Sequence, residues 1–257
     1  MEKTRAVVRE TVLEAGEAIR RKFGKRVEID FKGAIDLVTE VDRRSEEIIV
    51  SALRKAFPRD DILAEEGGSR KGGGSDRIWL VDPLDGTTNF AHGYPFISIS
   101  VALEAAGEIR YGVVYDPLRD EYFEAEKGEG SSLNGRPIRV SEADDLRACL
   151  FSTGFPYDIQ EHPEGHMEPL VRILMASQGI RRDGSAALDL CYVACGRFDG
   201  FYERKLAPWD TAAGVRIGEE AGGKVTSFGG GAYSIHDKEI LATNGRIHEA
   251  AVKILTA

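Results

Sequence analysis

The sequence predicts a layered α/β fold, with an antiparallel sheet in the first half of the chain and mixed strands and helices in the second. Three patterns lead to this expectation. Two charged stretches near the N-terminus carry apolar residues at helical spacing, residues 96–140 alternate with a period of two, and beyond about Leu146 short apolar runs alternate with helical patterns. Strands that alternate with helices are typical of layered α/β structure.

The N-terminal elements follow from the spacing of apolar residues. Residues 1–23 are charged throughout, which predicts an amphipathic helix and not a signal peptide. Its apolar stripe consists of Val8, Val12, Ala15, Ile19 and Phe23. An alternating strand is expected over residues 27–31, and a second helix from about Val41 to Phe57, where Pro58 ends it.

Three short segments follow the second helix. The apolar run Ile62–Ala64 predicts a strand, and Arg70–Ser75 predicts a mobile surface loop because its glycines leave nothing to pack. Residues Ile78–Val81 then predict a buried strand, which Pro83 and Gly86 are expected to end.

The rest of the chain divides into two patterns. Residues 96–140 predict an antiparallel meander with turns at Gly107-Glu108 and Asn134-Gly135. Beyond it we expect strands near residues 149–153, 198–202 and 240–243, and helices near 167–176, 185–195, 209–221 and the C-terminus. We expect residues 1–145 and 146–257 to form two halves of one continuous domain, because no internal repeat or long linker separates them.

The composition is that of an ordinary globular protein. Of the 257 residues, 42% are hydrophobic and 30% are charged, and the formal net charge of −9 argues against a nucleic-acid-binding surface. No apolar run approaches the length of a membrane span. The three cysteines form no paired framework, which fits a reducing compartment and predicts a cytoplasmic protein.

Residues 79–89 carry the strongest functional signal. An apolar run delivers Asp82, Asp85 and a hydroxyl residue into one turn that contains proline and glycine. Two like charges held together repel unless a cation intervenes, and such hard oxygen ligands suit Mg²⁺ or Mn²⁺ better than zinc. An Asx-rich surface turn is the alternative.

Three further acidic clusters stand beside turns or helix starts, at Asp36–Asp42, Glu65-Glu66 and Pro208–Asp210. Each has an ordinary explanation taken singly: a helix start, a solvated surface, or an acid that favours a helix dipole. Taken together with the turn at residues 82–89, they fit a phosphatase with several metal ions, which needs carboxylates from separate elements in one pocket.

On these residues the chain resembles the inositol monophosphatase family of Mg²⁺-dependent, lithium-sensitive phosphomonoesterases. The resemblance covers nearly all of the chain, and the signature stretches DPLDGTTN and PWDTAAG lie about 120 residues apart in the expected order. The matching residues are Lys32, Asp36–Asp42, Glu65, Glu66, Asp82–Asn89, Gly184–Ala187, Pro208–Asp210 and Ala212–Gly214.

The resemblance implies a set of metal ligands. Glu65, Asp82 and the carbonyl of Leu84 would hold one Mg²⁺, while Asp82, Asp85 and Asp210 would hold a second. A weaker third ion would depend on Glu65 through water, and Mn²⁺ is a substitute for Mg²⁺. The physics agrees, because a phosphate dianion cannot approach four carboxylates without cations.

The resemblance also implies catalytic and substrate-binding roles. Thr87 and Asp42, with Glu65, would orient and deprotonate the attacking water, and the amides of Gly86 and Thr87 would bind the phosphate. The residues expected to face the alcohol are Ser185, Glu203 and Asp210, together with Asp85. The implied fold is an αβαβα sandwich of the sugar-phosphatase type, and a homodimer is expected.

The substrate is left open by these residues. Inositol 1-phosphate is favoured, but relatives that act on fructose bisphosphate, histidinol phosphate or adenosine bisphosphate share the metal ligands. Arg204 and Lys205 stand near the expected pocket, either as solvated side chains or as contacts to a second phosphate. Asp183 precedes Gly184 and would disfavour a second phosphate.

Three other interpretations compete with this one. A haloacid-dehalogenase-type phosphatase needs two aspartates two residues apart, whereas Asp82 and Asp85 are three apart. Cys191 and Arg197 have the spacing of a cysteine phosphatase, but Cys191 continues an apolar helical stripe and is expected in the core. Some bacterial members of the family act as partners of the transcription machinery, so a regulatory role stays open.

Overall fold

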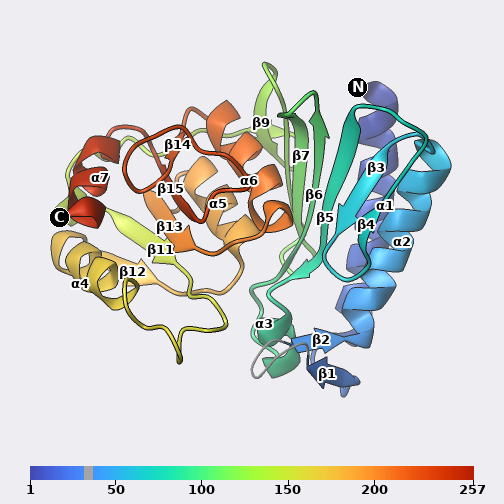
Figure 1. Cartoon of the computed structure of the whole chain (residues 1–257), viewed down its shortest axis with the longest axis horizontal. Coiled ribbons are helices and arrows are strands. Elements are labelled where there is room, and N and C mark those ends of the chain that lie inside the picture. Colours follow the sequence, from blue (N-terminus) through green and yellow to red (C-terminus); the bar gives the residue numbers. More distant parts are fainter. Residues whose placement is uncertain (32–36) are drawn as a thin grey trace.

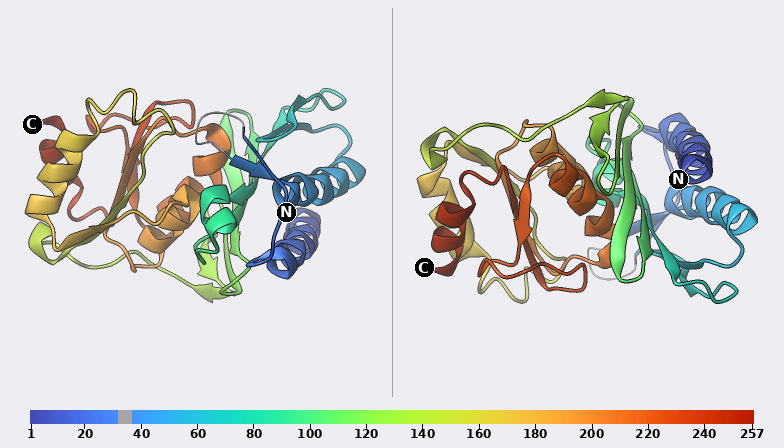
Figure 2. Two further views of the ribbon diagram at one scale, coloured as in Figure 1. Left: turned by 90° about the horizontal axis from the view of Figure 1, so that it is seen from below. Right: turned by 90° about the horizontal axis from the view of Figure 1, so that it is seen from above.

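The computed structural model, which describes residues 1–31 and 37–257, consists of helices and sheets in alternating layers (Figure 1). Helices α1 and α2 form one outer layer, and an eight-stranded sheet follows. Helices α5 and α6 form the central layer, a five-stranded sheet comes next, and α4 and α7 form the other outer layer. The predicted αβαβα sandwich is confirmed. The views in Figure 2 show the N- and C-termini in opposite outer layers.

The first outer layer consists of α1 (Glu2–Lys22) and α2 (Glu40–Ala56), as the apolar spacing predicts. The buried stripe of α1 includes Val8 and Ile19, and burying each side chain of this size contributes about 1.5–3 kcal/mol. Thr39 caps α2, because its hydroxyl accepts from the amide of Val41, while the Asp42 carboxylate accepts from the amide of Thr39. Helix α2 therefore starts at a fixed point beside the sheet.

The eight-stranded sheet contains the predicted meander. Its strand order is β10-β9-β8-β7-β6-β5-β3-β4, and all neighbours are antiparallel except β3 and β5. The strands are β3 (Asp61–Ala64), β4 (Gly68–Arg70), β5 (Arg77–Asp85), β6 (Ser98–Ala105), β7 (Glu108–Asp116), β8 (Glu121–Glu126), β9 (Gly130–Leu133) and β10 (Arg136–Pro137). Asn134 and Gly135 both have positive φ, which a two-residue hairpin turn requires. A separate pair joins β1 (Ile29–Phe31) to β2 (Leu37–Thr39).

The five-stranded sheet has mixed pairing, with the order β12-β11-β13-β15-β14. Its strands are β11 (Leu150–Thr153), β12 (Gly179–Arg181), β13 (Gly200–Arg204), β14 (Lys224–Thr226) and β15 (Glu239–Thr243). The helices of this half are α4 (Met167–Ala176), α5 (Ala186–Ala194), α6 (Pro208–Glu220) and α7 (His248–Thr256), with a short 3₁₀ turn at Leu146–Ala148. Every residue of α5 is buried, because the helix lies between the two sheets.

The core between the sheets draws residues from both halves of the chain. Val114 and Phe123 of the first sheet share one cluster with Leu190 of α5 and Ala213 of α6. Helix α6 approaches β7 closely, since a side chain on Gly112 would lie 2.8 Å from the carbonyl oxygen of Ala213. The boundary near residue 145 stays a prediction.

One local expectation was wrong, and another was right only in part. Strand β5 does not end before Pro83 but continues to Asp85, with a register shift against β6 between Asp82 and Asp85. Such an irregularity accommodates a residue that has no amide hydrogen. Residues 71–74 form an exposed loop, as expected, but the segment makes contacts: Arg70 ends β4, and the amides of Gly73 and Ser75 both donate to the carbonyl of Arg59.

Some predictions from the sequence fall on residues that the structure does not describe, and others stay untested. Lys32 and Asp36, which belong to the family resemblance, lie outside them. Among the helices formed by residues 1–31 and 37–257, none has the length and apolar character that a membrane crossing requires. Cys149, Cys191 and Cys195 are all free thiols, and the cytoplasmic location stays a prediction.

Candidate active site

The turn at residues 82–89 joins β5 to the short helix α3 (Thr87–His92), which the sequence did not predict. The amide of Leu84 donates to the Asp82 carboxylate at 3.0 Å, so Asp82 folds back over its own turn. Gly86 has a φ of 94°, and a side chain there would lie 2.9 Å from the carbonyl oxygen of Phe96. Only glycine fits this position, which places Asp85 and Thr87 on the two sides of one sharp bend.

The first turn of α5 holds Asp85 in place. The Ser185 hydroxyl donates to the Asp85 carboxylate at 2.7 Å, and the amide of Ala187 donates to the same oxygen at 2.9 Å. Ser185 is the N-cap residue of α5, and a carboxylate is favoured at the positive end of a helix. The Gly184–Ala187 segment therefore joins the second half of the chain to the acidic turn of the first half.

A chain of hydroxyl and carboxylate groups lies behind the turn. The Thr87 hydroxyl donates to Oδ1 of Asp42 at 2.7 Å, and Oδ2 of Asp42 accepts from the amide of Thr39 at 2.8 Å. Asp42 is fully buried, and burial raises its pKa although Thr39 and Thr87 oppose the rise. Thr87 is therefore oriented by a carboxylate of increased basicity.

These elements surround a cavity of about 660 Å³ between the two halves of the chain. Every predicted site residue except Asp42 lines it, and Asp42 reaches it only through Thr87. The predicted residues on its wall are Glu65, Asp82, Leu84, Asp85, Gly86, Thr87, Ser185, Glu203, Arg204, Lys205 and Asp210. Asp183 is not part of this wall; its carboxylate accepts from the Tyr94 hydroxyl at 3.3 Å.

Burial and neighbouring carboxylates raise the pKa values of three acidic groups of the cavity. Burial raises the pKa of Asp82 well above its usual range, and the carboxylates of Glu65, Asp85 and Asp210 raise it further. Burial also raises the pKa of Asp210, and it raises the pKa of Asp85 to about 6 against the opposing effect of its donors. In the described part of the chain, no ion pair joins Asp82, Asp85 or Asp210 to a basic side chain.

This donor set fits a hard divalent cation. Four carboxylates and the Leu84 carbonyl supply oxygen atoms, and a positive charge would offset the repulsion that raises the pKa of Asp82. Within residues 1–31 and 37–257, no group of three or more His, Cys, Asp or Glu side chains is placed to hold a metal ion as it stands.

The opposite wall of the cavity carries a different group of charges. Glu203 at the end of β13 is buried, and its carboxylate leaves no room for a side chain on Gly154. Burial raises the pKa of Glu203 to about 8, while the nearby Arg182 guanidinium lowers it and Asp85 raises it. Glu203 is therefore protonated at neutral pH and can both donate and accept a hydrogen bond.

Among residues 1–31 and 37–257, three basic residues line the cavity, and two of them have acidic partners. Arg204 lies 3.3 Å from Glu239, and Lys205 donates to Asp158 at 2.6 Å. Arg182, which the sequence analysis missed, makes no hydrogen bond or ion pair with the described residues. The sequence does contain a signal for Arg182, because this residue stands two positions before Gly184 of the family motif.

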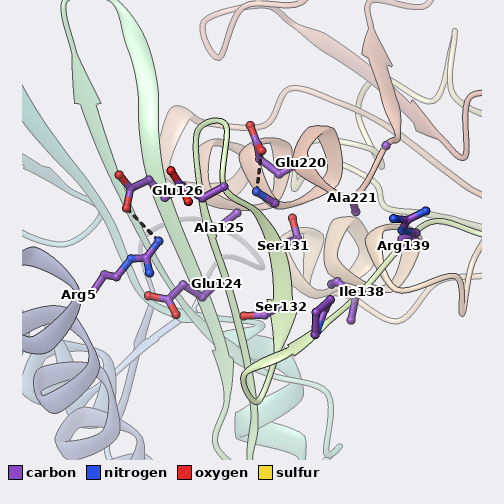
Figure 3. Close-up of a pocket in the computed structure, with 14 residues that line it drawn as sticks. Arg5, Glu124, Ala125, Glu126, Ser131, Ser132, Ile138, Arg139, Glu220 and Ala221 are labelled. Atoms are coloured by element: carbon purple, nitrogen blue, oxygen red, sulfur yellow. Dashed lines mark hydrogen bonds and ion pairs between the residues drawn. The ribbon is translucent and has the colours of Figure 1, made fainter. Parts of the chain in front are cut away.

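A second cavity of about 450 Å³ lies beside β8 and β9, away from the predicted residues (Figure 3). Several of its charged side chains bind neighbouring residues. Arg5 lies 2.9 Å from Glu126, and the Glu220 carboxylate accepts from the amide of Gly130 at 3.0 Å. None of the predicted site residues lines this cavity.

Comparison with known proteins identifies the family. A sequence profile described as the inositol monophosphatase family matches residues 1–257. The chain belongs to the inositol monophosphatase family. It is 44% identical over 242 residues to the Nus factor SuhB of Pseudomonas aeruginosa, covering 92% of this chain and 89% of that protein. It is also 44% identical over 252 residues to the inositol-1-monophosphatase of a Synechocystis species, covering 98% and 88% respectively.

Solved structures agree with this membership. The crystal structure of the extragenic suppressor protein suhB from Bartonella henselae superposes with a TM-score of 0.94 at 41% identity and covers 98% of both chains. The fold and the family are thereby confirmed, and the family is one of metal-dependent phosphatases.

The expected core position of Cys191 is also confirmed, and Arg197 pairs with Glu121 instead of approaching that thiol.

Proposed function

We propose that the protein is a Mg²⁺-dependent phosphatase that hydrolyses a phosphate monoester, with inositol 1-phosphate as the favoured substrate. The observation that carries the proposal is the convergence of Glu65, Asp82, Asp85 and Asp210 on one cavity beside the Thr87–Asp42 pair. Family membership supports the reaction class. The identity of the metal and the substrate are parts of the proposal.

The proposed ligands divide into two overlapping sets. Glu65, Asp82 and the Leu84 carbonyl would hold one Mg²⁺, and Asp82, Asp85 and Asp210 would hold a second, with a weaker third ion near Glu65. When bound, the ions would neutralise the phosphate, activate water and stabilise the leaving alkoxide. Mn²⁺ is expected to substitute, and Li⁺ to inhibit.

The Thr87–Asp42 pair would receive the proton of the attacking water. The Thr87 hydroxyl donates to Asp42, so its lone pairs can accept a proton from water while its own proton moves to the carboxylate. The water oxygen bonds to phosphorus as the bond between phosphorus and the alcohol oxygen breaks. The amides of Gly86 and Thr87 would bind the phosphate oxygens, and no phosphoenzyme is required.

Ser185, Glu203 and Asp210 would bind the alcohol. Because Glu203 is protonated near neutral pH, it can pair with a hydroxyl group in either direction, which suits a polyol such as inositol. A bisphosphate such as fructose 1,6-bisphosphate is the alternative substrate. Arg204 and Lys205 would contact its second phosphate only by leaving Glu239 and Asp158, whereas Arg182 has no such partner in the part of the chain that the structure describes.

A turnover panel tests the proposal directly. Phosphate release would be measured from inositol 1-phosphate, fructose 1,6-bisphosphate, histidinol phosphate and adenosine 3′,5′-bisphosphate, with Mg²⁺, with Mn²⁺, and with Mg²⁺ plus Li⁺. We expect the highest kcat/KM on inositol 1-phosphate and inhibition by Li⁺. An absence of Mg²⁺-dependent release from all four compounds would contradict the proposal.

A second candidate function is a binding role in transcription. The name of the P. aeruginosa relative, Nus factor SuhB, favours it. The decisive variant is Asp85→Asn, which should abolish turnover. If this variant still binds purified RNA polymerase or Nus factors, the interaction is independent of catalysis; if neither it nor the wild type binds, the second function is rejected.

We also propose that the chain forms a homodimer. One face of α4 exposes four large apolar side chains, which are between 41% and 81% accessible: Met167, Val171, Leu174 and Met175. A continuous exposed apolar face is typical of an interaction surface. Sedimentation velocity should show a dimer for the wild type and a monomer for Val171→Glu; a wild-type monomer would refute the proposal.

A further inference from the structure

Helix α2 buries three polar side chains on the face that meets the active-site turn. Asp42, Ser45 and Glu46 follow one another at helical spacing, and they are 0%, 0% and 4% exposed. Burying polar groups is costly unless each finds a hydrogen-bond partner, so the partners show what this face holds. Asp42 holds Thr87, as described above, while neither Ser45 nor Glu46 lines the cavity.

Ser45 holds the acidic turn itself. Its hydroxyl donates to the carbonyl oxygen of Pro83 at 2.7 Å. Pro83 stands between Asp82 and Leu84, at the place where β5 shifts its register against β6. Because the backbone of β5 does not pair regularly with β6 at this point, its carbonyl groups need other hydrogen-bond donors. The Ser45 hydroxyl is the donor for one of them, the Pro83 carbonyl.

Glu46 holds the segment that carries Glu65. Its Oε2 accepts from the amide of Glu66 at 2.8 Å, and its Oε1 lies 3.5 Å from the Arg70 guanidinium. The fit is close, because a side chain on Gly67 would lie 2.5 Å from that Oε1. The amide of Glu65 in turn donates to the carbonyl of Val81 on β5. The Glu65 backbone is therefore fixed between α2 and β5.

We propose that Ser45 and Glu46 are positioning residues for the metal site, and that α2 sets the distance between Glu65 and the Asp82–Asp85 turn. The inference rests on the proposed function. Glu65 directly follows β3 and Asp82 belongs to β5, and two adjacent residues of α2 bind both segments. Residues that orient metal ligands in this way affect metal affinity although they do not touch the ion.

Direct metal binding tests the proposal without reference to turnover. Isothermal titration with Mg²⁺ and Mn²⁺ electron paramagnetic resonance would compare the wild type with Glu46→Ala, Glu46→Gln and Ser45→Ala. We expect Glu46→Ala to weaken binding about 10- to 100-fold, as losses of such supporting groups do. Glu46→Gln keeps an oxygen that can accept from Glu66, so its loss should be smaller. Glu47→Gln is the matched control, because Glu47 faces solvent and pairs with Arg44.

Turnover measured against metal concentration separates positioning from simple packing. A positioning role predicts that Glu46→Ala needs more Mg²⁺ for half-maximal activity, while kcat and KM at saturating Mg²⁺ recover most of the wild-type values. Unchanged Mg²⁺ affinity with a kcat that stays low at every metal concentration would overturn the inference. Wild-type protein that binds no Mg²⁺ would instead overturn the proposed function on which it rests.

Gly67→Ala is the second variant if Glu46→Ala fails to fold. Its methyl group would push against the tips of Glu46 and Arg70 without removing either charge, and Gly67 does not have the positive φ that would strain an alanine. We expect Gly67→Ala to weaken Mg²⁺ binding in the same direction as Glu46→Ala. Wild-type affinity in this variant would contradict the role given to Glu46.

Discussion

The two walls of the cavity hold their charged groups in different ways. On the wall formed by β5 and α3, Asp82 and Asp85 accept hydrogen bonds from backbone or hydroxyl donors, and the Thr87 hydroxyl is itself bound by Asp42 of α2 behind the wall. On the wall formed by β13 and the segment before α5, neither Glu203 nor Arg182 makes a hydrogen bond with the described residues. The first wall is organised before any ligand arrives, whereas the second has polar groups left for one.

This difference separates reaction from substrate. Groups that are held in advance stabilise charge in a transition state without reorganisation, so the β5 wall suits chemistry common to a whole family. Groups without protein partners gain their hydrogen bonds from the ligand, so the β13 wall suits discrimination between alcohols. Variants on the two walls should therefore fail in different ways.

The largest effect is expected from Asp82→Asn on the wall formed by β5 and α3. The variant removes the proposed bridging carboxylate, and metal stabilisation of several kcal/mol corresponds to a loss of about a thousandfold or more in kcat/KM. Mg²⁺ titration should show weaker binding in parallel. Asp61→Asn is the control, since Asp61 pairs with Lys71 at the surface and should keep near wild-type activity. Turnover that survives Asp82→Asn would remove this wall from the mechanism.

A smaller loss is expected when the proton acceptor is removed but the carboxylates of the cavity stay. Thr87→Ala should lower kcat by about 10²–10⁴-fold, which is the usual contribution of a positioned acid or base. Thr87→Ser keeps the hydroxyl that donates to Asp42 and should retain most activity. Calorimetry should show unchanged Mg²⁺ binding in both variants. If Thr87→Ala lost metal affinity as strongly as activity, its role would be structural.

The sequence predicts the wall formed by β5 and α3 better than the wall formed by β13 and the segment before α5. Periodic apolar residues locate α2 and β5, and the spacing of Asp82, Asp85 and Thr87 identifies the turn, because these signals are local. The register shift at Pro83 is absent from such patterns, since it depends on pairing with β6. A local pattern predicts a strand end wherever proline occurs, whereas the neighbouring strand decides whether pairing resumes.

The second wall depends on contacts that are distant in the sequence. Arg204 and Lys205 attract attention because they adjoin Glu203, but their charges are neutralised by Glu239 and Asp158, from other segments. Arg182 has no comparable partner within residues 1–31 and 37–257, and no local sequence pattern predicts this difference from Arg204 and Lys205. For the same reason Ser45 and Glu46 look like ordinary helix residues until their partners on β5 and beside β4 are known.

A moderate and substrate-dependent effect is expected from Arg182→Ala on the second wall. A hydrogen bond to a charged group contributes about 1.5–3 kcal/mol, so a second phosphate that binds this guanidinium would lose about tenfold or more in kcat/KM. Inositol 1-phosphate, which has one phosphate, should change less than twofold. Arg204→Ala is the comparison, because its partner is Glu239. Equal losses on mono- and bisphosphates in Arg182→Ala would contradict a role in selectivity.

The smallest effect concerns stability and its dependence on pH. The pKa of Glu203 rises from 4.5 to about 8 on folding, so between these values the folded state keeps a proton that the unfolded state releases. Stability contributed by this group is therefore complete below about pH 4.5 and is lost as pH rises towards 8. Glu203→Gln does not titrate, so with EDTA present its Tm should match the wild type near pH 5.

At pH 8 the same variant should exceed the wild type by about 2–4 °C for each kcal/mol regained. A difference that stayed constant between pH 5 and pH 8 would show that Glu203 is not protonated in the folded protein. The second wall would then present a fixed negative charge to the substrate. The contrast between a wall whose carboxylates are bound by protein donors and a wall whose polar groups are left for the ligand would then fail at Glu203.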